Sequence, residues 1–494
     1  MPRKATHTKK KTVGKKATKK IVVNTKVAGA KKKVIKNAPR KRKYSTVKKI
    51  DVKIMKVKEP APKEKKAKGL TTLRGMRDIL PKHGSLWQKV HHACEDIAEA
   101  YGFTYIETPI LEQASLFIRS LGKASDIVGK EMYVFEDRDG TKVCLRPEAT
   151  ASVARSYMNN GMHTLPQPVK VWYMGPMFRH ERPQAGRYRQ LHQFGCESFG
   201  EHSSIVDAEL ISVAYNILRD LGINSTVHIN SIGTPEEREH YVVELVGYLR
   251  SKRSYLSEDS KKRINKNPLR VLDSKIEQDR TVIEEAPQLI DWLSDNSKKF
   301  FMSVLEYLDE AQIPYVLAPT LVRGLDYYTD TVFELYEDGV EEQSQNALCG
   351  GGRYDGLVEQ LGGQPTPGAG FSFGVDRIVG VLQRKQEEKM QAGEKPEVPG
   401  GVFFAQLGEQ ARKRALYLVE ELRREGILVH HNLAKFSLRA QLEMADKLGV
   451  SHTLILGQKE AQDKTILIRN MESGIQEIID QKKIKSAVQK LFDN

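Results

Sequence analysis

Alternating apolar and polar residues predict two strands near the middle of the chain. One run passes through Val169, Val171 and Tyr173, and a second begins at Leu191 and continues to residue 197. Because successive side chains of a strand point to opposite faces, this period of two is typical of strands. The two runs flank the segment 179–189, so the pattern predicts a hairpin.

Apolar residues at helical spacing mark the segments around this hairpin. They predict a helix over 86–101, with Gly102 as its stop. The next run, F-T-Y-I-E-T-P-I-L-E, is strand-like and breaks at Pro109. Residues 132–136 and 142–145 flank D-R-D-G, which favours a hairpin turn. Charged sequence with apolar positions at helical spacing fills 236–318 and predicts a helical insertion.

The last part of the chain, residues 399–494, alternates strand and helix patterns. V-F-F-A-Q-L, I-L-V-H-H and T-L-I-L-G read as strands, separated by amphipathic helices over 410–425 and 437–448. T-I-L-I-R and I-Q-E-I-I read as a hairpin across M-E-S-G, before a final basic helix. This alternation implies a mixed sheet covered by helices, in a domain whose role the pattern alone leaves open.

The basic charge is concentrated at the N-terminus. The 494 residues have a formal net charge of +16, and residues 1–68 hold 27 Lys and Arg against 3 Asp and Glu, a net of +24. The remaining 52 basic and 60 acidic residues give −8, so that part must bind any nucleic acid through local patches. With few large apolar side chains, residues 1–68 are expected to be disordered. We interpret this tail as an anchor for RNA or another polyanion; a dispensable solvated extension and an organelle transit peptide are the alternatives.

Cysteine spacing and hydropathy restrict the setting of the protein. The four cysteines lie far apart, with no C-x-x-C pair and no His spaced for zinc, so we expect neither a disulfide framework nor a structural metal site. A reduced, cytoplasmic setting fits best. No apolar run approaches the roughly 20 residues of a membrane span, and the N-terminus lacks the apolar segment of a secretory signal, so no membrane partner is expected.

Candidate chemistry begins in the hairpin. Its loop holds four arginines, including Arg179 and Arg187, and its second strand carries Gln193 and Glu197. Guanidinium groups match phosphate oxygens, so the loop suits a polyphosphate and the strand a small polar substrate. A solvated basic hairpin is the simpler alternative, and the interleaved Gln, His and Glu count against it.

A second candidate segment reads R-P-E-A-T. Glu148 and Thr150 follow a proline that stops a strand, and a helix starts next, so both side chains can face a cleft at the strand end. Alternatively, Thr150 caps the helix and Glu148 is a first-turn acid favoured by the helix dipole.

The segment V-R-G-L-D-Y-Y places Arg323 before Tyr327 and Tyr328. Successive residues of an extended chain face opposite sides, so at most one tyrosine is expected to touch a given ligand. The run Gly350 to Gly352 lets backbone approach a ligand closely, although a flexible turn is the alternative. G-A-G-F-S-F then leads into a helix whose first turn carries Arg377.

These segments resemble one enzyme family. F-R-H-E-R followed by R-Y-R-Q-L-H-Q resembles motif 2 of the class II aminoacyl-tRNA synthetases, in the form found in histidyl-tRNA synthetases. V-R-G-L-D-Y-Y and A-L-C-G-G-G-R-Y-D-G-L are similar to the two histidine-specific signatures of that family. G-A-G-F-S-F with its helix resembles motif 3, and the helix, strand and Pro109 look like motif 1, which builds the dimer interface. The resemblance covers residues 70–494.

The resemblance implies an α+β fold. A class II antiparallel sheet flanked by helices would occupy 69–235 and 319–392, interrupted by the helical insertion over 236–318, which in the family reaches toward the acceptor arm of the tRNA. Residues 399–494 look like the mixed α/β anticodon-binding domain of the histidyl, prolyl, threonyl and glycyl group. Residues 1–68 would be an added tail.

The resemblance also implies a reaction and a site. ATP and histidine would give histidyl-adenylate and pyrophosphate, and the histidyl group would pass to the terminal ribose of tRNA-His in a homodimeric enzyme. Mg²⁺ should accompany ATP. Carboxylate attack on the α-phosphorus needs positioning and charge neutralisation more than a strong base. The residues implied are Arg179, Gln193 and Arg323 for catalysis; Glu148, Ala149, Thr150, Gln193, Glu197, Arg323, Tyr327 and Tyr328 for histidine; and Arg179, Arg187 and Arg377 for ATP.

Two details qualify this assignment. Gly is common in the family where this chain has Ala149. Glu197 and Tyr328 would contact the imidazole. A carboxylate paired with a hydroxyl can bond both ring nitrogens, so side chains of similar shape that lack these nitrogens would be rejected.

The rival interpretations are a catalytically silent regulatory paralogue, which would lack the C-terminal domain, and a purely nucleic-acid-binding protein, which would not need the histidine signatures.

Overall fold

The computed structural model describes residues 70–122, 125, 127–181, 187–340, 347–393 and 400–491. The predicted disorder of the tail concerns residues outside these ranges. Within them, no helix is both long enough and apolar enough to cross a membrane.

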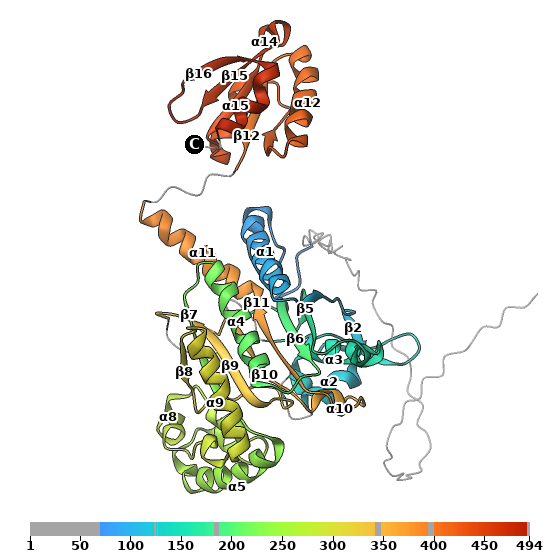
Figure 1. Ribbon diagram of the computed structural model, residues 1–494, viewed down its shortest axis with the longest axis vertical. Helices are drawn as coiled ribbons and strands as arrows, with labels where there is room; N and C mark the ends of the chain where they lie inside the picture. The colour runs from blue at the N-terminus through green and yellow to red at the C-terminus, as the bar shows by residue number, and fades with distance from the viewer. Residues whose placement is uncertain are drawn as a thin grey trace, which may run out of the picture. The chain divides into compact units, whose positions relative to one another are not determined.

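An eight-stranded sheet forms the centre of residues 70–393 (Figure 1). Only the two outer pairs, β1 with β5 and β7 with β8, are parallel, so the predicted antiparallel character is confirmed. The strands in spatial order are β1 (Thr104–Tyr105), β5 (Val169–Phe178), β6 (Gln190–Phe199), β11 (Gly368–Gly374), β10 (Cys349–Arg353), β9 (Thr329–Glu337), β7 (Ser225–Ser231) and β8 (Tyr315–Leu317).

The predicted central hairpin is confirmed as β5 and β6. Val169 pairs with Phe199 at one end and Phe178 with Gln190 at the other. Alternation along β5 sends Trp172 into one hydrophobic core, and Val171 and Tyr173 into another on the opposite face. Residues 182–186 of the intervening loop lie outside the described ranges.

Four helices cover one face of the sheet and pack on one another (Figure 1). They are α1 (Gly84–Ala100), α4 (Ser204–Asp220), α9 (Asp295–Glu310) and α11 (Val375–Gln391). The helix predicted over 86–101 is confirmed as α1. Its buried residues Val90 and Ala93 follow the helical spacing, and Gly102 stands just after its end at φ +78°.

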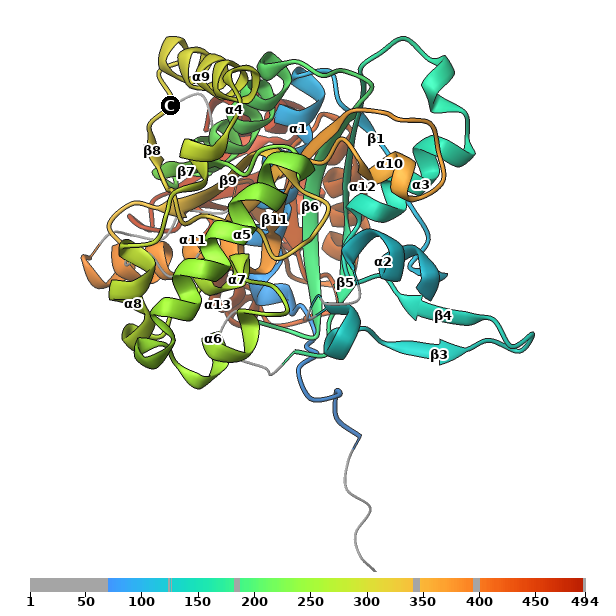
Figure 2. The same cartoon turned by 90° about the horizontal axis from the view of Figure 1, so that it is seen from below.

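The other face carries the helical insertion and three shorter helices (Figure 2). The insertion contains α5 (Pro235–Ser251), α6 (Glu258–Arg263), α7 (Leu269–Leu272) and α8 (Glu277–Glu284), and the shorter helices are α2 (Ala114–Leu121), α3 (Thr150–Asn159) and α10 (Leu357–Gln360). Helix α5 starts with a capping box, in which Thr234 and Glu237 each bond the backbone N–H of the other.

A three-stranded sheet stands beside the large one. It contains β2 (Leu111–Gln113), β4 (Lys142–Leu145) and β3 (Val134–Glu136), and Figure 2 shows β3 and β4 projecting as a hairpin. The predicted D-R-D-G turn is confirmed, with Gly140 at φ +85°. Strand β3 begins at Val134, two residues later than predicted.

Residues 400–491 form a separate five-stranded sheet that is mixed, as predicted, and its strand order is β13–β12–β14–β15–β16. The short helix α14 (Gln458–Asp463) was not predicted, because its six residues carry no buried apolar position. The other elements are β12 (Val402–Gln406), α12 (Glu409–Arg424), β13 (Val429–His431), α13 (Leu438–Leu448), β14 (His452–Leu456), β15 (Thr465–Asn470), β16 (Gln476–Asp480) and α15 (Ile484–Lys490).

Candidate active site

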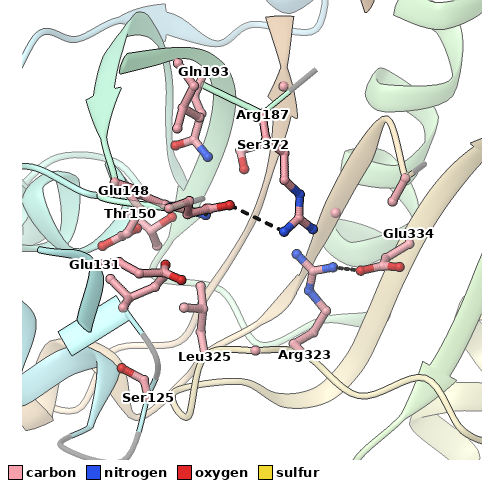
Figure 3. A pocket seen from close by; sticks show the side chains of 18 of the residues that line it. Ser125, Glu131, Glu148, Thr150, Arg187, Gln193, Arg323, Leu325, Glu334 and Ser372 are labelled. Atoms are coloured by element: carbon pink, nitrogen blue, oxygen red, sulfur yellow. Dashed lines mark hydrogen bonds and ion pairs between the residues drawn. The ribbon is translucent and has the colours of Figure 1, made fainter. Parts of the chain in front are cut away.

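A cavity of about 920 Å³ lies among strands β6, β10 and β11, the start of α3 and the turn before β9 (Figure 3). Most of the predicted site residues meet in it. Two do not line it, since Ala149 and Glu197 are buried behind its surface, each 1% exposed. The predicted residues that line it are Glu148, Thr150, Arg179, Arg187, Gln193, Arg323, Tyr327, Tyr328 and Arg377.

Glu148 has one bonded and one unbonded oxygen. Its Oε1 accepts a hydrogen bond from the backbone N–H of Ala151 at 3.1 Å, whereas its buried Oε2 has no partner among the described residues. Burial raises the pKa of this carboxyl, and the Ala151 N–H and the Arg179 guanidinium only partly offset that effect. Oε1 therefore behaves as the alternative interpretation expects, bonding a backbone N–H in the first turn of the helix. Oε2 remains available to accept from a cationic group of a ligand.

Thr150 does not cap its helix. Its hydroxyl donates instead to Oε1 of Glu197 at 2.7 Å. The same oxygen accepts from the hydroxyl of Tyr173 at 3.3 Å, and Oε2 accepts from the hydroxyl of Tyr354. Burial raises the pKa of Glu197 to about 8, although these hydroxyl donors stabilise the carboxylate. The three donors fix the carboxyl group in one orientation.

Tyr354 and Tyr173 were not among the predicted site residues. Tyr354 stands in the same signature as the glycine run, which was the available signal. Tyr173 was identified only as part of an alternating strand, and its contact with Glu197 depends on the pairing of β5 with β6.

Glycines make room for two of these side chains. A Cβ on Gly370 would lie 2.7 Å from the Cδ of Glu197 and 2.7 Å from the Cys196 carbonyl oxygen. A Cβ on Gly350 would lie 2.6 Å from the Cζ of Arg323. Real Cβ atoms do not approach so closely, so the bare backbone of β10 and β11 is a condition for placing both side chains.

Arg323 crosses the cavity from the turn before β9. Its guanidinium forms an ion pair with Glu334, which also accepts from the hydroxyl of Tyr336, and it lies 5.6 Å from the centroid of the Tyr328 ring. Burial would lower the pKa of this guanidinium, but the Glu334 carboxylate outweighs burial and the pKa lies above its ordinary value. Figure 3 shows the guanidinium groups of Arg323 and Arg187 pointing toward each other.

The expected placement of the two adjacent tyrosines on opposite sides of an extended chain is wrong. Both Tyr327 and Tyr328 line the cavity, and their ring centroids are 4.7 Å apart. Residues 324–327 form a bend and a turn before β9 begins, so the alternation of an extended strand does not apply to them.

Three arginines gather on another wall. Arg179 donates from Nε to the Pro147 carbonyl at 2.8 Å, Arg187 pairs with Glu181 at 3.4 Å, and Arg377 donates to the Ala347 carbonyl at 2.5 Å. The pKa of Arg377 lies below its ordinary value because the group is buried and because Arg187 and Arg179 repel its charge. Such repulsion is relieved by a polyanion.

The helical insertion contributes more positive charge, which the sequence patterns did not reveal. Lys262, Arg263, Lys266 and Arg270 from α6, α7 and their connection line the same cavity. Their role depends on how the insertion packs on the sheet, a long-range contact that no local motif reports.

Comparisons with known proteins identify one family in both sequence and structure. The sequence profile described as histidyl-tRNA synthetase matches residues 75–235 and 245–378, and the one described as anticodon binding domain matches 401–491. A histidine-tRNA ligase of Synechococcus sp. (strain JA-3-3Ab) is 42% identical over 411 residues, covering 83% of this chain and 96% of the relative. A second histidine-tRNA ligase, of Halothermothrix orenii, is 43% identical over 404 residues, covering 82% of this chain and 95% of the relative. The crystal structure of apo S. aureus histidyl-tRNA synthetase shares 32% identity at a TM-score of 0.68, covering 85% of this chain and all of that one.

Proposed function

The chain belongs to the histidyl-tRNA synthetase family and has histidine-tRNA ligase function, and from this premise we propose that the cavity is where histidine and ATP react. A single observation carries the proposal. One cavity joins a Glu148 carboxylate oxygen that has no partner among the described residues, the histidine-signature residues Arg323 and Tyr328, and the arginine wall. A regulatory paralogue has little support, because both relatives are ligases and the C-terminal domain is present.

The reaction has two steps. A carboxylate oxygen of histidine attacks the α-phosphorus of ATP, the bond to the β-phosphate oxygen breaks, and histidyl-adenylate and pyrophosphate result. A hydroxyl of the terminal ribose of tRNA-His then attacks the acyl carbon, and AMP leaves. Negative charge grows on the phosphate oxygens in the first step, so fixed guanidinium groups lower its barrier by electrostatic stabilisation.

Histidine is proposed to lie between Glu148 and Glu197. The free Oε2 of Glu148 would accept from the α-ammonium group, with Thr150 and Gln193 beside it; the Gln193 Oε1 is also buried and unpartnered among the described residues. Tyr328 would bond one imidazole nitrogen, and Glu197, which lies behind the cavity surface, would act on the other through one of its three hydroxyl donors. Tyr327 would shape the wall, and Ala149 would support it from behind.

ATP is proposed to lie along the arginines. Arg179 would hold the α-phosphate, Arg377 and Arg187 the distal phosphates, and Arg323 would approach the α-phosphate and the histidine carboxylate from the opposite wall. Mg²⁺ is proposed to arrive with ATP, because Mg²⁺ is usually held by one or two carboxylates and substrate phosphates.

The predicted division of the chain is kept as part of the proposal. Residues 69–235 and 319–392 would belong to the catalytic domain, and 399–494 would be the anticodon-binding domain. Within the predicted insertion 236–318, helices α5 to α8 would reach toward the acceptor arm, whereas α9 and β8 belong to the layers of the large sheet and would be part of the catalytic domain. The basic residues that the insertion brings to the cavity support a route for the acceptor end of the tRNA.

Three further proposals concern the whole protein. A homodimer is supported by exposed apolar residues after α1, where Tyr105 is 54% and Leu111 50% exposed. The tail is proposed to bind RNA, and its charge supports this. A cytoplasmic location is supported by the four cysteines, all free.

The first test is histidine-dependent exchange of labelled pyrophosphate into ATP, without tRNA and with the other amino acids as controls. We expect exchange with histidine alone. We expect Arg323→Ala to reduce it by about 10² to 10³ while folding is kept. Exchange that is absent from the folded wild-type protein would refute the proposed function, and near-normal exchange in Arg323→Ala would refute the role of that residue.

A further inference from the structure

The segment at the start of the described chain touches the arginine wall from outside. Residues 70–80 form no strand or helix, and almost all of them are exposed. Such a segment has little apolar burial to hold it in place. It is held instead by contacts with two segments, the base of the hairpin loop, which both the Gly75 backbone and the Arg77 side chain touch, and the first turn of α11, which Arg77 touches.

The first contact is with the loop of the central hairpin. The carbonyl of Gly75 accepts from the backbone N–H of Arg189 at 2.7 Å, and Arg189 in turn bonds Arg179 across the base of the loop at 2.9 Å. The guanidinium of Arg77 lies 4.0 Å from the centroid of the Tyr188 ring, and its Nη1 donates to the Tyr188 hydroxyl at 2.8 Å. Tyr188 lines the cavity and is the neighbour of Arg187.

The second contact is with the first turn of α11. Nη2 of Arg77 forms an ion pair with Oδ1 of Asp376 at 2.7 Å, and Oδ2 of Asp376 accepts from the backbone N–H of His192 at 2.7 Å. Burial would raise the pKa of Asp376, but the bonds from His192 and Arg77 outweigh burial and the pKa lies below its ordinary value. Asp376 also lines the cavity and is the neighbour of Arg377.

One side chain therefore joins the two segments that supply Arg187 and Arg377. Their positive charges repel each other, and burial together with this repulsion keeps the pKa of Arg377 below its ordinary value. Before a polyphosphate neutralises them, their charges favour separation of the loop from the helix. The Arg77 guanidinium bonds Tyr188, the neighbour of Arg187, and Asp376, the neighbour of Arg377, and so opposes that separation. ATP then loses less binding free energy to ordering the two arginines.

We propose that Arg77 is a positioning residue, which holds the hairpin loop against α11 and so pre-organises Arg187 and Arg377 for the polyphosphate end of ATP. The inference rests on the proposed function for the identity of the nucleotide. It predicts an effect on ATP and none on histidine, because the Arg77 contacts lie beside the arginine wall and not beside Glu148 or Glu197.

The test compares Arg77→Ala, Arg77→Lys and Arg74→Ala in the full chain. Arg74 is a matched control, because it lies on the same exposed segment and its side chain makes no hydrogen bond or ion pair with any described residue. In pyrophosphate exchange, we expect Arg77→Ala to raise the KM for ATP about 10-fold, with kcat and the KM for histidine nearly unchanged. Arg77→Lys should fall between, since it keeps the charge but loses the planar fork and the ring contact.

Calorimetric titration of ATP into each protein without histidine gives a second measurement that does not depend on catalysis. We expect about 10-fold weaker binding in Arg77→Ala and wild-type binding in Arg74→Ala. Wild-type ATP affinity in Arg77→Ala would overturn the inference and leave the proposed function intact. An equal rise in both KM values together with a lower melting temperature would also overturn it, because it would indicate a folding role. Absence of histidine-dependent exchange in the wild type would refute the proposed function, whereas the titration would still decide the role of Arg77.

Discussion

Replacing Gly350 with alanine tests whether bare backbone in β10 is needed to place Arg323. The added Cβ would overlap the guanidinium of Arg323, closest to its Nη2, whereas ordinary contacts are 3.4 Å or longer, so the guanidinium must move by about 1 Å. The obstructing group is the end of a flexible side chain, and the backbone of Gly350 is not in the left-handed region. The substitution should therefore displace Arg323 without disturbing the sheet.

The expected loss is large for one methyl group. A displacement of about 1 Å in a group that stabilises the transition state can cost about 10²-fold in rate. We therefore expect kcat/KM for pyrophosphate exchange to fall about 100-fold, or about 2.7 kcal/mol. The free energy of unfolding should change by less than about 1 kcal/mol, because Gly to Ala at a permitted conformation restricts mainly the unfolded chain.

Two controls separate this mechanism from general damage. In Gly351→Ala, the Cβ would meet the backbone oxygen of Gly370 and lie 2.6 Å from the Cβ of Phe371, so the central sheet itself must shift and the melting temperature should fall. If Gly350→Ala acts through Arg323, the double variant Gly350→Ala/Arg323→Ala should be no slower than Arg323→Ala alone. Near-normal exchange in Gly350→Ala, or additive losses in the double variant, would refute the reasoning.

Three other outcomes are expected. Folding raises the pKa of Glu197 from its ordinary 4.5 to about 8, so the stability contributed by its protonated form is complete below about pH 4.5 and is lost as pH rises through 8. In urea unfolding, the wild type should therefore lose stability relative to Glu197→Gln between pH 5 and 9. A stability difference that does not depend on pH would contradict the shift. Tyr354→Phe removes a hydroxyl donor to Glu197 and should raise the KM for histidine about 5- to 10-fold with little change in the KM for ATP; equal effects on both substrates would argue against a local role. Deleting residues 1–68 should leave exchange intact and reduce the salt dependence of tRNA affinity, measured by filter binding over a salt series; an unchanged salt slope would exclude the tail as an anchor.

Local patterns were sufficient for most of the fold. Period-two alternation identified β5 and β6, and helical spacing ended by a glycine identified α1, because in both cases the signal lies within one element. Most of the predicted site residues meet in one cavity, since the motifs mark segments whose meeting point is set by the sheet.

The failures concern contacts between distant segments. The donors Tyr173 and Tyr354 are 24 and 157 residues from Glu197, and no local spacing reports such a pairing. The orientation of Tyr327 and Tyr328 was mispredicted because a turn, and not a strand, precedes β9. The contacts of Arg77 join residue 77 to residues 188 and 376, and only the folded chain brings these together.

The strand order of the large sheet also has a consequence for synthesis on the ribosome. Strand β6 ends at Phe199, and its neighbour β11 begins only at Gly368, so 168 residues separate them. At about 5 to 20 residues per second, the nascent chain would present an unpaired β6 edge for roughly 10 to 30 s. The two strands that then fill the centre, β10 and β11, are rich in glycine and have little intrinsic tendency to form strands, so they are expected to add to an edge that is already in place. The glycine-rich strands that make room for Arg323 and Glu197 would thus leave the nascent chain with an exposed β6 edge, which must be protected from aggregation until they are synthesised.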